Sequence, residues 1–155
     1  MSSLGKQFEQ KVKEDFVKVD GATIDRLYDT TNGFKNISQI SDFIGYRYPN
    51  IFYLEVKSHS GNTFPLTKLT QYGKLVSKVG IYGVRAGVII WFYDHDKVVY
   101  VPISEITKMK NDGKKSVNIK MLSEKSYNII EIPSIKKRTF LDSDYRVLMS
   151  LKEGE

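Results

Sequence analysis

The chain of 155 residues contains no cysteine and only two histidines, His59 and His95. These absences exclude disulfides, thiolate metal sites, cysteine nucleophiles and a zinc site built from several histidines. Any catalytic metal must therefore be held mainly by oxygen atoms, which favours Mg²⁺, with Mn²⁺ as a substitute. The lack of cysteine also agrees with a reducing compartment, so we expect a cytoplasmic protein.

Long apolar runs are missing as well. The longest, Ala86 to Tyr93, is far shorter than the roughly 20 residues of a membrane helix and is typical of a buried strand. The N-terminal residues lack the apolar segment of a signal peptide, so we expect neither export nor a membrane partner. With no repeat or linker, the length predicts one domain, residues 1–155. The net charge of +6 weakly favours an anionic partner.

Apolar periodicity predicts an alternation of helices and strands. Leu4, Phe8, Val12 and Phe16 recur every four residues, as in an amphipathic helix. The other predicted elements are a strand at Ala22–Tyr28, a loop at Asp29–Lys35, a hairpin of Ile40–Tyr46 and Ile51–Lys57, a helix from Pro65 to Gly80, strands at Ala86–Tyr93 and Lys97–Ile103, a helix from Ser104 to Asn111, strands near Val117–Lys120 and Tyr127–Ile132, and a helix at Leu141–Leu151. This order indicates an α/β or α+β sandwich.

The predicted hairpin carries the chemistry. Its turn near Pro49 brings Asp42 back beside Glu55, and Glu55 and Lys57 project to the same face because side chains alternate along a strand. Two neighbouring carboxylates repel each other, and a divalent cation relieves that repulsion. Such a cation activates phosphodiesters for hydrolysis, while a lysine orients water or offsets developing charge. A plain cross-strand salt bridge, worth well under about 1 kcal/mol, explains the triplet equally well.

A wider resemblance favours the nuclease interpretation. Ser41-Asp42 with Glu55-Val56-Lys57 resembles the PD-(D/E)xK nuclease signature. The surroundings resemble the RecU-type Holliday junction resolvases, especially the short phage-like members. The likeness rests on these segments, in chain order: Gly5–Glu9, Ser41–Gly45, Tyr53–Ser58, Asn62–Leu66 with Gln71, Gly87–Ile90, Tyr100–Ile103 and Lys137–Asp142.

The resemblance implies a fold, an activity and partners. The fold is a restriction-endonuclease-like mixed β-sheet flanked by helices. The activity is Mg²⁺-dependent endonucleolytic cleavage of four-way DNA junctions by paired symmetric nicks, in recombination and repair. Because paired nicks need two symmetric active sites, a homodimer is expected. The setting would be the cytoplasm of a bacterial cell or a phage-infected host.

The resemblance also implies a role for each site residue. Asp42 and Glu55 bind the metal with the Val56 carbonyl, and Lys57 positions the attacking water. Glu9 and Gln71 are accessory catalytic residues. A solvated Glu9 paired with Lys13, or an exposed Gln71 amide, is equally compatible with the sequence.

The sequence departs from the family pattern in three places. No proline precedes Asp42, Leu54 stands where many members have a second acid, and the stretch Tyr28 to Ser38 is short where larger members insert a stalk. Two alternatives therefore remain: another nuclease of this fold, of restriction, nicking or repair type, and a non-catalytic DNA-binding protein.

Six basic residues are candidate contacts to the DNA backbone: Arg26, Lys35, Arg47, Lys136, Lys137 and Arg138. Several of them lie beside aromatic residues or in a short run of cations. The alternatives are solvated basic faces and, for Arg26, a salt bridge to Asp25 or Asp29.

Overall fold

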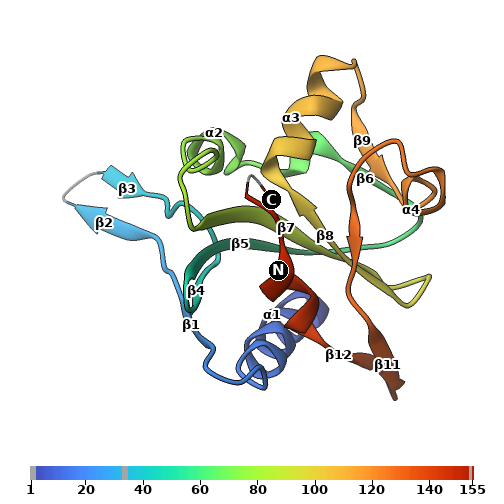
Figure 1. The fold of residues 1–155 in the computed structure, drawn as a ribbon, viewed down its shortest axis with the longest axis horizontal. Coiled ribbons are helices and arrows are strands. Elements are labelled where there is room, and N and C mark those ends of the chain that lie inside the picture. The colour runs from blue at the N-terminus through green and yellow to red at the C-terminus, as the bar shows by residue number, and fades with distance from the viewer. Residues whose placement is uncertain (1–2, 33–34, 154) are drawn as a thin grey trace.

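A six-stranded mixed sheet forms the centre of the protein (Figure 1). The computed structural model describes residues 3–32, 35–153 and 155, with the backbone alone for residues 3, 31, 32 and 35–37. The strands in spatial order are β1 (Thr23–Arg26), β4 (Phe43–Arg47), β5 (Asn50–His59), β7 (Val84–Phe92), β8 (Lys97–Pro102) and β10 (Ile130–Glu131). Strands β5 and β7 are parallel, and the other neighbouring pairs are antiparallel.

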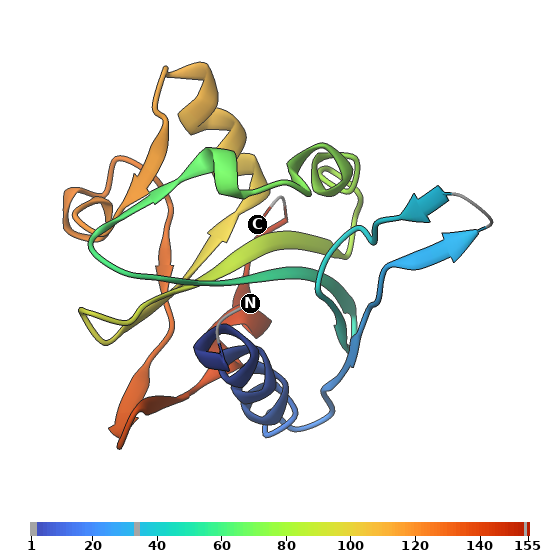
Figure 2. The ribbon, with the colours of Figure 1, turned by 180° about the vertical axis from the view of Figure 1, so that it is seen from behind.

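Helices cover both faces of this sheet, as the front and rear views show (Figures 1 and 2). Helix α1 (Ser3–Phe16) packs on one face, against alternate residues of β5 such as Leu54 and Val56. Helices α2 (Tyr72–Val76) and α3 (Ile103–Asn111) cover the other face. Strand β7 is buried on both faces, which explains its unbroken apolar run. The expected α/β class, a mixed sheet flanked by helices, is confirmed.

Smaller elements surround the two layers. Strands β2 (Thr30–Asn32) and β3 (Lys35–Ile37) form an arm that projects from the body beside β4 (Figures 1 and 2). The others are β6 (Thr63–Pro65), which pairs with β9 (Ser116–Asn118); the 3₁₀ helices η1 (Leu66–Lys68) and η2 (Tyr145–Ser150); α4 (Met121–Glu124); and the hairpin of β11 (Ser134–Lys137) and β12 (Phe140–Ser143). In the described part of the chain, no helix is long and apolar enough to cross a membrane.

The prediction of one helix from Pro65 to Gly80 is wrong. Pro65 ends strand β6, and the helical part is reduced to one 3₁₀ turn and the five residues of α2. Pro65 is compatible with β6 because this short strand has a single partner, β9, more than 50 residues away in the chain. That long-range pairing overrides the local apolar pattern, and Val76, the last residue of α2, is 37% exposed.

The predictions for two other segments are also wrong. Of the expected loop at residues 29–35, Thr30–Asn32 form β2 and Lys35 begins β3, while residues 33 and 34 lie outside the described part of the chain. The segment Leu141–Leu151, expected as an α-helix, begins in β12 and continues as η2. Leu141, Tyr145 and Leu148 are all buried, and their helical spacing comes from a strand followed by a 3₁₀ helix that face the same core. Apolar spacing alone does not distinguish these two arrangements.

A close approach inside the sheet predicts a large effect on stability. A Cβ on Gly87 would lie 2.2 Å from the ring of Tyr100, which is fully buried. Gly87→Ala should therefore lower the free energy of unfolding by about 1–3 kcal/mol, through overpacking. In α2, a Cβ on Gly73 meets nothing within 4 Å, so Gly73→Ala should be neutral or slightly stabilising. Urea unfolding of both variants tests this, and equal stabilities would contradict it.

Candidate functional site

The hairpin of β4 and β5 places two carboxylates side by side. Phe43 pairs with Leu54, so Asp42 lies opposite Glu55, which confirms the predicted register. The Asp42 N–H donates to Glu55 Oε1 at 3.0 Å, and the Val56 N–H donates to Asp42 Oδ2 at 2.9 Å. Each carboxylate is thus anchored by the backbone of the neighbouring strand and keeps its second oxygen for other partners.

Lys57 joins this pair from the same face of β5. Its Nζ lies 3.3 Å from Glu55 Oε2. The Lys57 side chain is 28% exposed, whereas that of Glu55 is 4% exposed. The lysine therefore covers the buried carboxylate and offers its charge to the open side of the site.

Arg26 connects helix α1 to the same site. Its guanidinium NH1 donates to Glu9 Oε2 at 2.5 Å, and NH2 lies 4.0 Å from Asp42 Oδ1. The guanidinium carbon also lies over the ring of Phe43, 5.3 Å from its centroid. The salt-bridge partner of Arg26 is thus Glu9, and the structure brings both residues to the carboxylate pair.

Arg26, Asp42, Glu55 and Lys57 line a cleft of about 260 Å³, and Glu9 lines a neighbouring pocket that shares Arg26, Asp42 and Lys57 with it. Gln71, just before α2, also lines the cleft, on the face of the sheet opposite to α1. Six more lining residues are absent from the predicted site: Leu27, Tyr28, Asp29, Gln39, Ser41 and Thr70. One feature of the sequence could have indicated them, because each lies within three positions of Arg26, Asp42 or Gln71, which are predicted site residues.

Burial and charge shift the proton affinity of the acids. Burial raises the pKa of Glu55 to about 7, and the negative charge of Asp42 adds to the increase, while Lys57 partly offsets it. Burial also raises the pKa of Glu9, against the opposing hydrogen bond from Arg26. A site that raises carboxyl pKa values favours a bound cation, because the cation removes the cost of holding both carboxylates ionised.

The raised pKa predicts how stability depends on pH. Between the ordinary value of 4.5 and about 7, folded Glu55 holds its proton while unfolded Glu55 loses it. In chelator, the free energy of unfolding should therefore fall as pH rises through this window, and Glu55→Gln should flatten that fall. Above pH 7, Mg²⁺ should raise the melting temperature of the wild type but not of the variant. Parallel pH profiles for the two proteins would contradict this prediction.

The donor atoms suit a hard divalent cation. Asp42 and Glu55 supply carboxylate oxygens, and the Val56 carbonyl is placed to join them. The Val56 N–H points toward Asp42, and the Val56 C=O points the same way because the N–H and C=O of one strand residue face the same side. Pairing between β4 and β5 starts only at Phe43 and Leu54, so Val56 is not part of that ladder. Among the described residues, no group of three or more His, Asp or Glu could hold a metal ion. Mg²⁺ needs only one or two protein carboxylates, since water and substrate phosphates complete its shell.

Leu54 does not reduce the number of carboxylates in the cleft. Its side chain is fully buried in the α1 core, on the face of β5 opposite to Glu55 and Lys57. An acid at position 54 would point away from the site.

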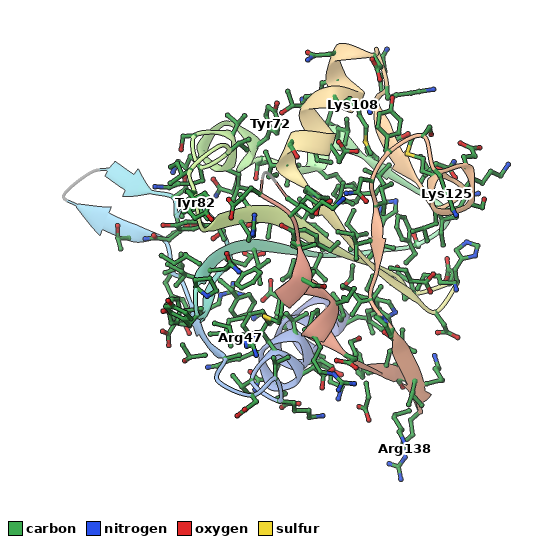
Figure 3. The ribbon with its side chains drawn as sticks, in the orientation of Figure 1. Arg47, Tyr72, Tyr82, Lys108, Lys125 and Arg138 are labelled. Carbon is green, nitrogen blue, oxygen red and sulfur yellow. The ribbon has the colours of Figure 1, made fainter. Side chains whose placement is uncertain are left out.

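Four of the other candidate DNA contacts do not line the cleft: Arg47, Lys136, Lys137 and Arg138, of which Figure 3 labels Arg47 and Arg138. Arg47 ends β4, roughly 16 Å along the strand from Asp42, and its Nε donates to the Asp20 carbonyl. Lys136, Lys137 and Arg138 belong to the β11–β12 hairpin, with Lys136 paired to Asp96 at 2.7 Å. The Lys35 side chain lies outside the described part of the structure.

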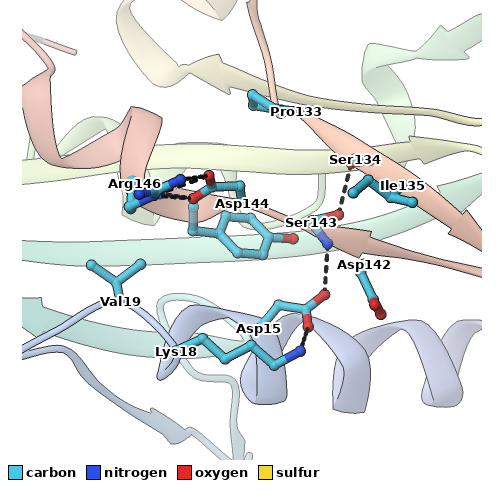
Figure 4. Close-up of a pocket in the computed structure, with 11 residues that line it drawn as sticks. Asp15, Lys18, Val19, Pro133, Ser134, Ile135, Asp142, Ser143, Asp144 and Arg146 are labelled. Carbon is cyan, nitrogen blue, oxygen red and sulfur yellow. Dashed lines mark hydrogen bonds and ion pairs between the residues drawn. The ribbon is translucent and has the colours of Figure 1, made fainter.

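A larger cavity, of about 480 Å³, lies between the end of α1 and β12 (Figure 4). Its charged groups bind one another: Asp15 accepts hydrogen bonds from Lys18 Nζ and from the Ser143 N–H, both at 3.0 Å, and Asp144 binds Arg146. Because the bond from the Ser143 N–H to Asp15 joins β12 to α1, a structural role explains this cavity.

Comparisons with known proteins agree with this geometry. The family model for RecU, described as Recombination protein U, matches residues 8–142. Among solved structures, the chain is similar to Hjc of Archaeoglobus fulgidus, described as a Holliday junction resolvase from an archaeal hyperthermophile. The TM-score is 0.51 at 17% identity, over 65% of this chain and 78% of that chain. This likeness confirms the expected restriction-endonuclease-like fold. No curated protein matches the chain.

Proposed function

Because the chain belongs to the RecU family, we propose that it is a Mg²⁺-dependent endonuclease that resolves four-way DNA junctions. The observation that carries the proposal is the interlocked carboxylate pair of Asp42 and Glu55, with Lys57 3.3 Å from Glu55. This arrangement supplies the charges that hydrolysis of a phosphodiester requires.

The predicted site residues have different parts in the proposed reaction. Asp42, Glu55 and the Val56 carbonyl would hold Mg²⁺ or Mn²⁺, which when bound supplies the positive charge that polarises the scissile phosphodiester. Lys57 orients the attacking water and offsets charge on the phosphorane oxygens. Gln71, which also lines the cleft, holds the water or a phosphate oxygen.

Glu9 and Arg26 act together in this proposal. Arg26 lies between Glu9 and Asp42, where its guanidinium neutralises part of the acidic charge. Its 27% exposed side chain also presents a cation to an incoming phosphate. Glu9 holds Arg26 in this place, so it serves the reaction by positioning that guanidinium.

Paired nicks require a second active site. We propose that a homodimer supplies it, with one site per protomer related by two-fold symmetry. The proposed setting is DNA recombination and repair in the cytoplasm.

The test compares DNA shapes with and without metal. Synthetic four-way, flap and linear DNA are incubated with the protein in Mg²⁺, in Mn²⁺ and in chelator. We expect metal-dependent symmetric nicks in the four-way junction and much slower cleavage of linear duplex. Equal cleavage of every shape would indicate another nuclease of this fold. Binding without cleavage would indicate a non-catalytic DNA-binding protein.

A further inference from the structure

The surface of α3 and the loop after it carries an excess of cations. Residues 103–128 contain six lysines and three acidic residues, so this sixth of the chain carries half of the net charge of +6. Four of these lysines lie close together in the sequence and are exposed: Lys108, Lys110, Lys114 and Lys115. We call them the α3 lysines.

Two of the three carboxylates in this stretch bind neutral donors rather than the α3 lysines. Glu105 accepts a hydrogen bond from the Asn128 N–H at 2.5 Å, and Asp112 accepts one from the Tyr127 hydroxyl at 2.7 Å. Within the part of the chain that the structure describes, none of the α3 lysines forms an ion pair. Some other lysines do form one, since Lys97 pairs with Glu131 at 2.9 Å.

Two of the α3 lysines are held over aromatic rings. Lys110 Nζ lies 4.6 Å from the ring centroid of Tyr72, and Lys108 Nζ lies 5.5 Å from that of Tyr127. A ring face orients the aliphatic stem and leaves the ammonium accessible to an anion. Holding the stems in this way lowers the entropy that these side chains lose when they bind.

The α3 lysines are continuous with the cleft. Gln71 lines the cleft, and the next residue, Tyr72, shares a hydrogen bond of 2.6 Å with the Thr107 hydroxyl of α3. Figure 3 shows Tyr72 and Lys108 on the neighbouring helices α2 and α3. The cationic surface therefore begins where the wall of the cleft ends.

We propose that the α3 lysines bind the phosphate backbone of a DNA arm that extends from the cleft across α2 and α3. The proposal rests on the proposed nuclease function and adds the surface that holds the substrate outside the metal centre. Accessible, unpaired ammonium groups on a folded element provide charge without base contacts, so the arm is bound independently of its sequence.

The experiment measures the salt dependence of DNA binding in chelator, so that cleavage does not interfere. The dissociation constant for a four-way junction and for linear duplex is determined from 50 to 200 mM salt. Lys108, Lys110 and Lys114 are replaced together by alanine, and the matched control replaces Lys18, Lys97 and Lys152, with the same loss of net charge. For the α3 variant, the slope of log K against log salt should become shallower by about 0.9 for each phosphate that is no longer bound, hence by about 2–3. The control should keep the wild-type slope.

Further variants exclude a structural explanation. A triple variant should keep the wild-type slope because the charges remain; it combines Lys108→Arg, Lys110→Arg and Lys114→Arg. An unchanged slope in the alanine variant, or equal changes in the alanine variant and the control, would overturn the inference.

The two proposals fail in different ways. If the wild type cleaves junctions in Mg²⁺ but the alanine variant keeps its slope, the α3 surface is wrong and the nuclease function stands. If the slope becomes shallower but the wild type cleaves no DNA in any metal, the nuclease function is wrong and the α3 surface stands as a DNA-binding site.

Discussion

Glu55→Gln is expected to reduce Mg²⁺-dependent cleavage by at least three orders of magnitude, which corresponds to about 4 kcal/mol. The amide keeps the shape of the side chain and its place beside the Asp42 N–H, but it removes the charge that holds a hard cation among oxygen ligands. Asp42→Asn should cause the same loss, because both carboxylates belong to one proposed site. Single-turnover cleavage of a labelled four-way junction measures the effect.

Measurements of junction binding distinguish a variant that no longer holds the metal from one that no longer folds. In chelator, both variants should bind the junction at least as tightly as the wild type, since one negative charge near the phosphates is gone. Glu14→Gln is the matched control, because Glu14 is an exposed acid on α1 that shares a hydrogen bond only with Gln10 among the contacts described. This control should cleave normally. Wild-type rates for Glu55→Gln in Mg²⁺ would show that the metal site is misplaced.

Lys57→Ala is expected to lower the cleavage rate by two or more orders of magnitude, on the order of 3 kcal/mol of transition-state stabilisation. The lysine lies beside Glu55 on the open side of the cleft, where it reaches water and phosphate. Junction affinity should stay within a few-fold, because the loss concerns the transition state. Lys13→Ala, on an exposed position of α1, serves as the control.

The pH profile tests whether Lys57 also tunes Glu55. Lys57 opposes the rise in the Glu55 pKa, so its removal should raise that pKa further. As the pH is lowered, the residual cleavage by Lys57→Ala should therefore begin to fall at a higher pH than wild-type cleavage does. If Lys57→Ala cleaves at the wild-type rate, the lysine has no part in the mechanism.

The sequence of one hairpin was sufficient to predict which three charged side chains lie together at the centre of the candidate site. A turn at Pro49 and the alternation of side chains along a strand place Asp42, Glu55 and Lys57 together, and the observed register agrees. The same two-residue period predicts that Leu54 and Val56 face the opposite core, as they do. These relations depend on neighbours within one hairpin, where chain geometry leaves few alternatives.

The tertiary structure alone decided the rest. Glu9 meets Arg26 because α1 packs across β1, and the sequence pattern favoured other partners for both residues. Gln71 reaches the cleft because the β6–β9 pairing shortens the predicted helix and leaves α2 at its wall. The raised pKa of Glu55 depends on burial by segments that are distant in the chain. Ion-pair partners, strand pairing over 50 residues and desolvation all depend on which surfaces meet in three dimensions, and the spacing of residues along one segment does not encode that choice.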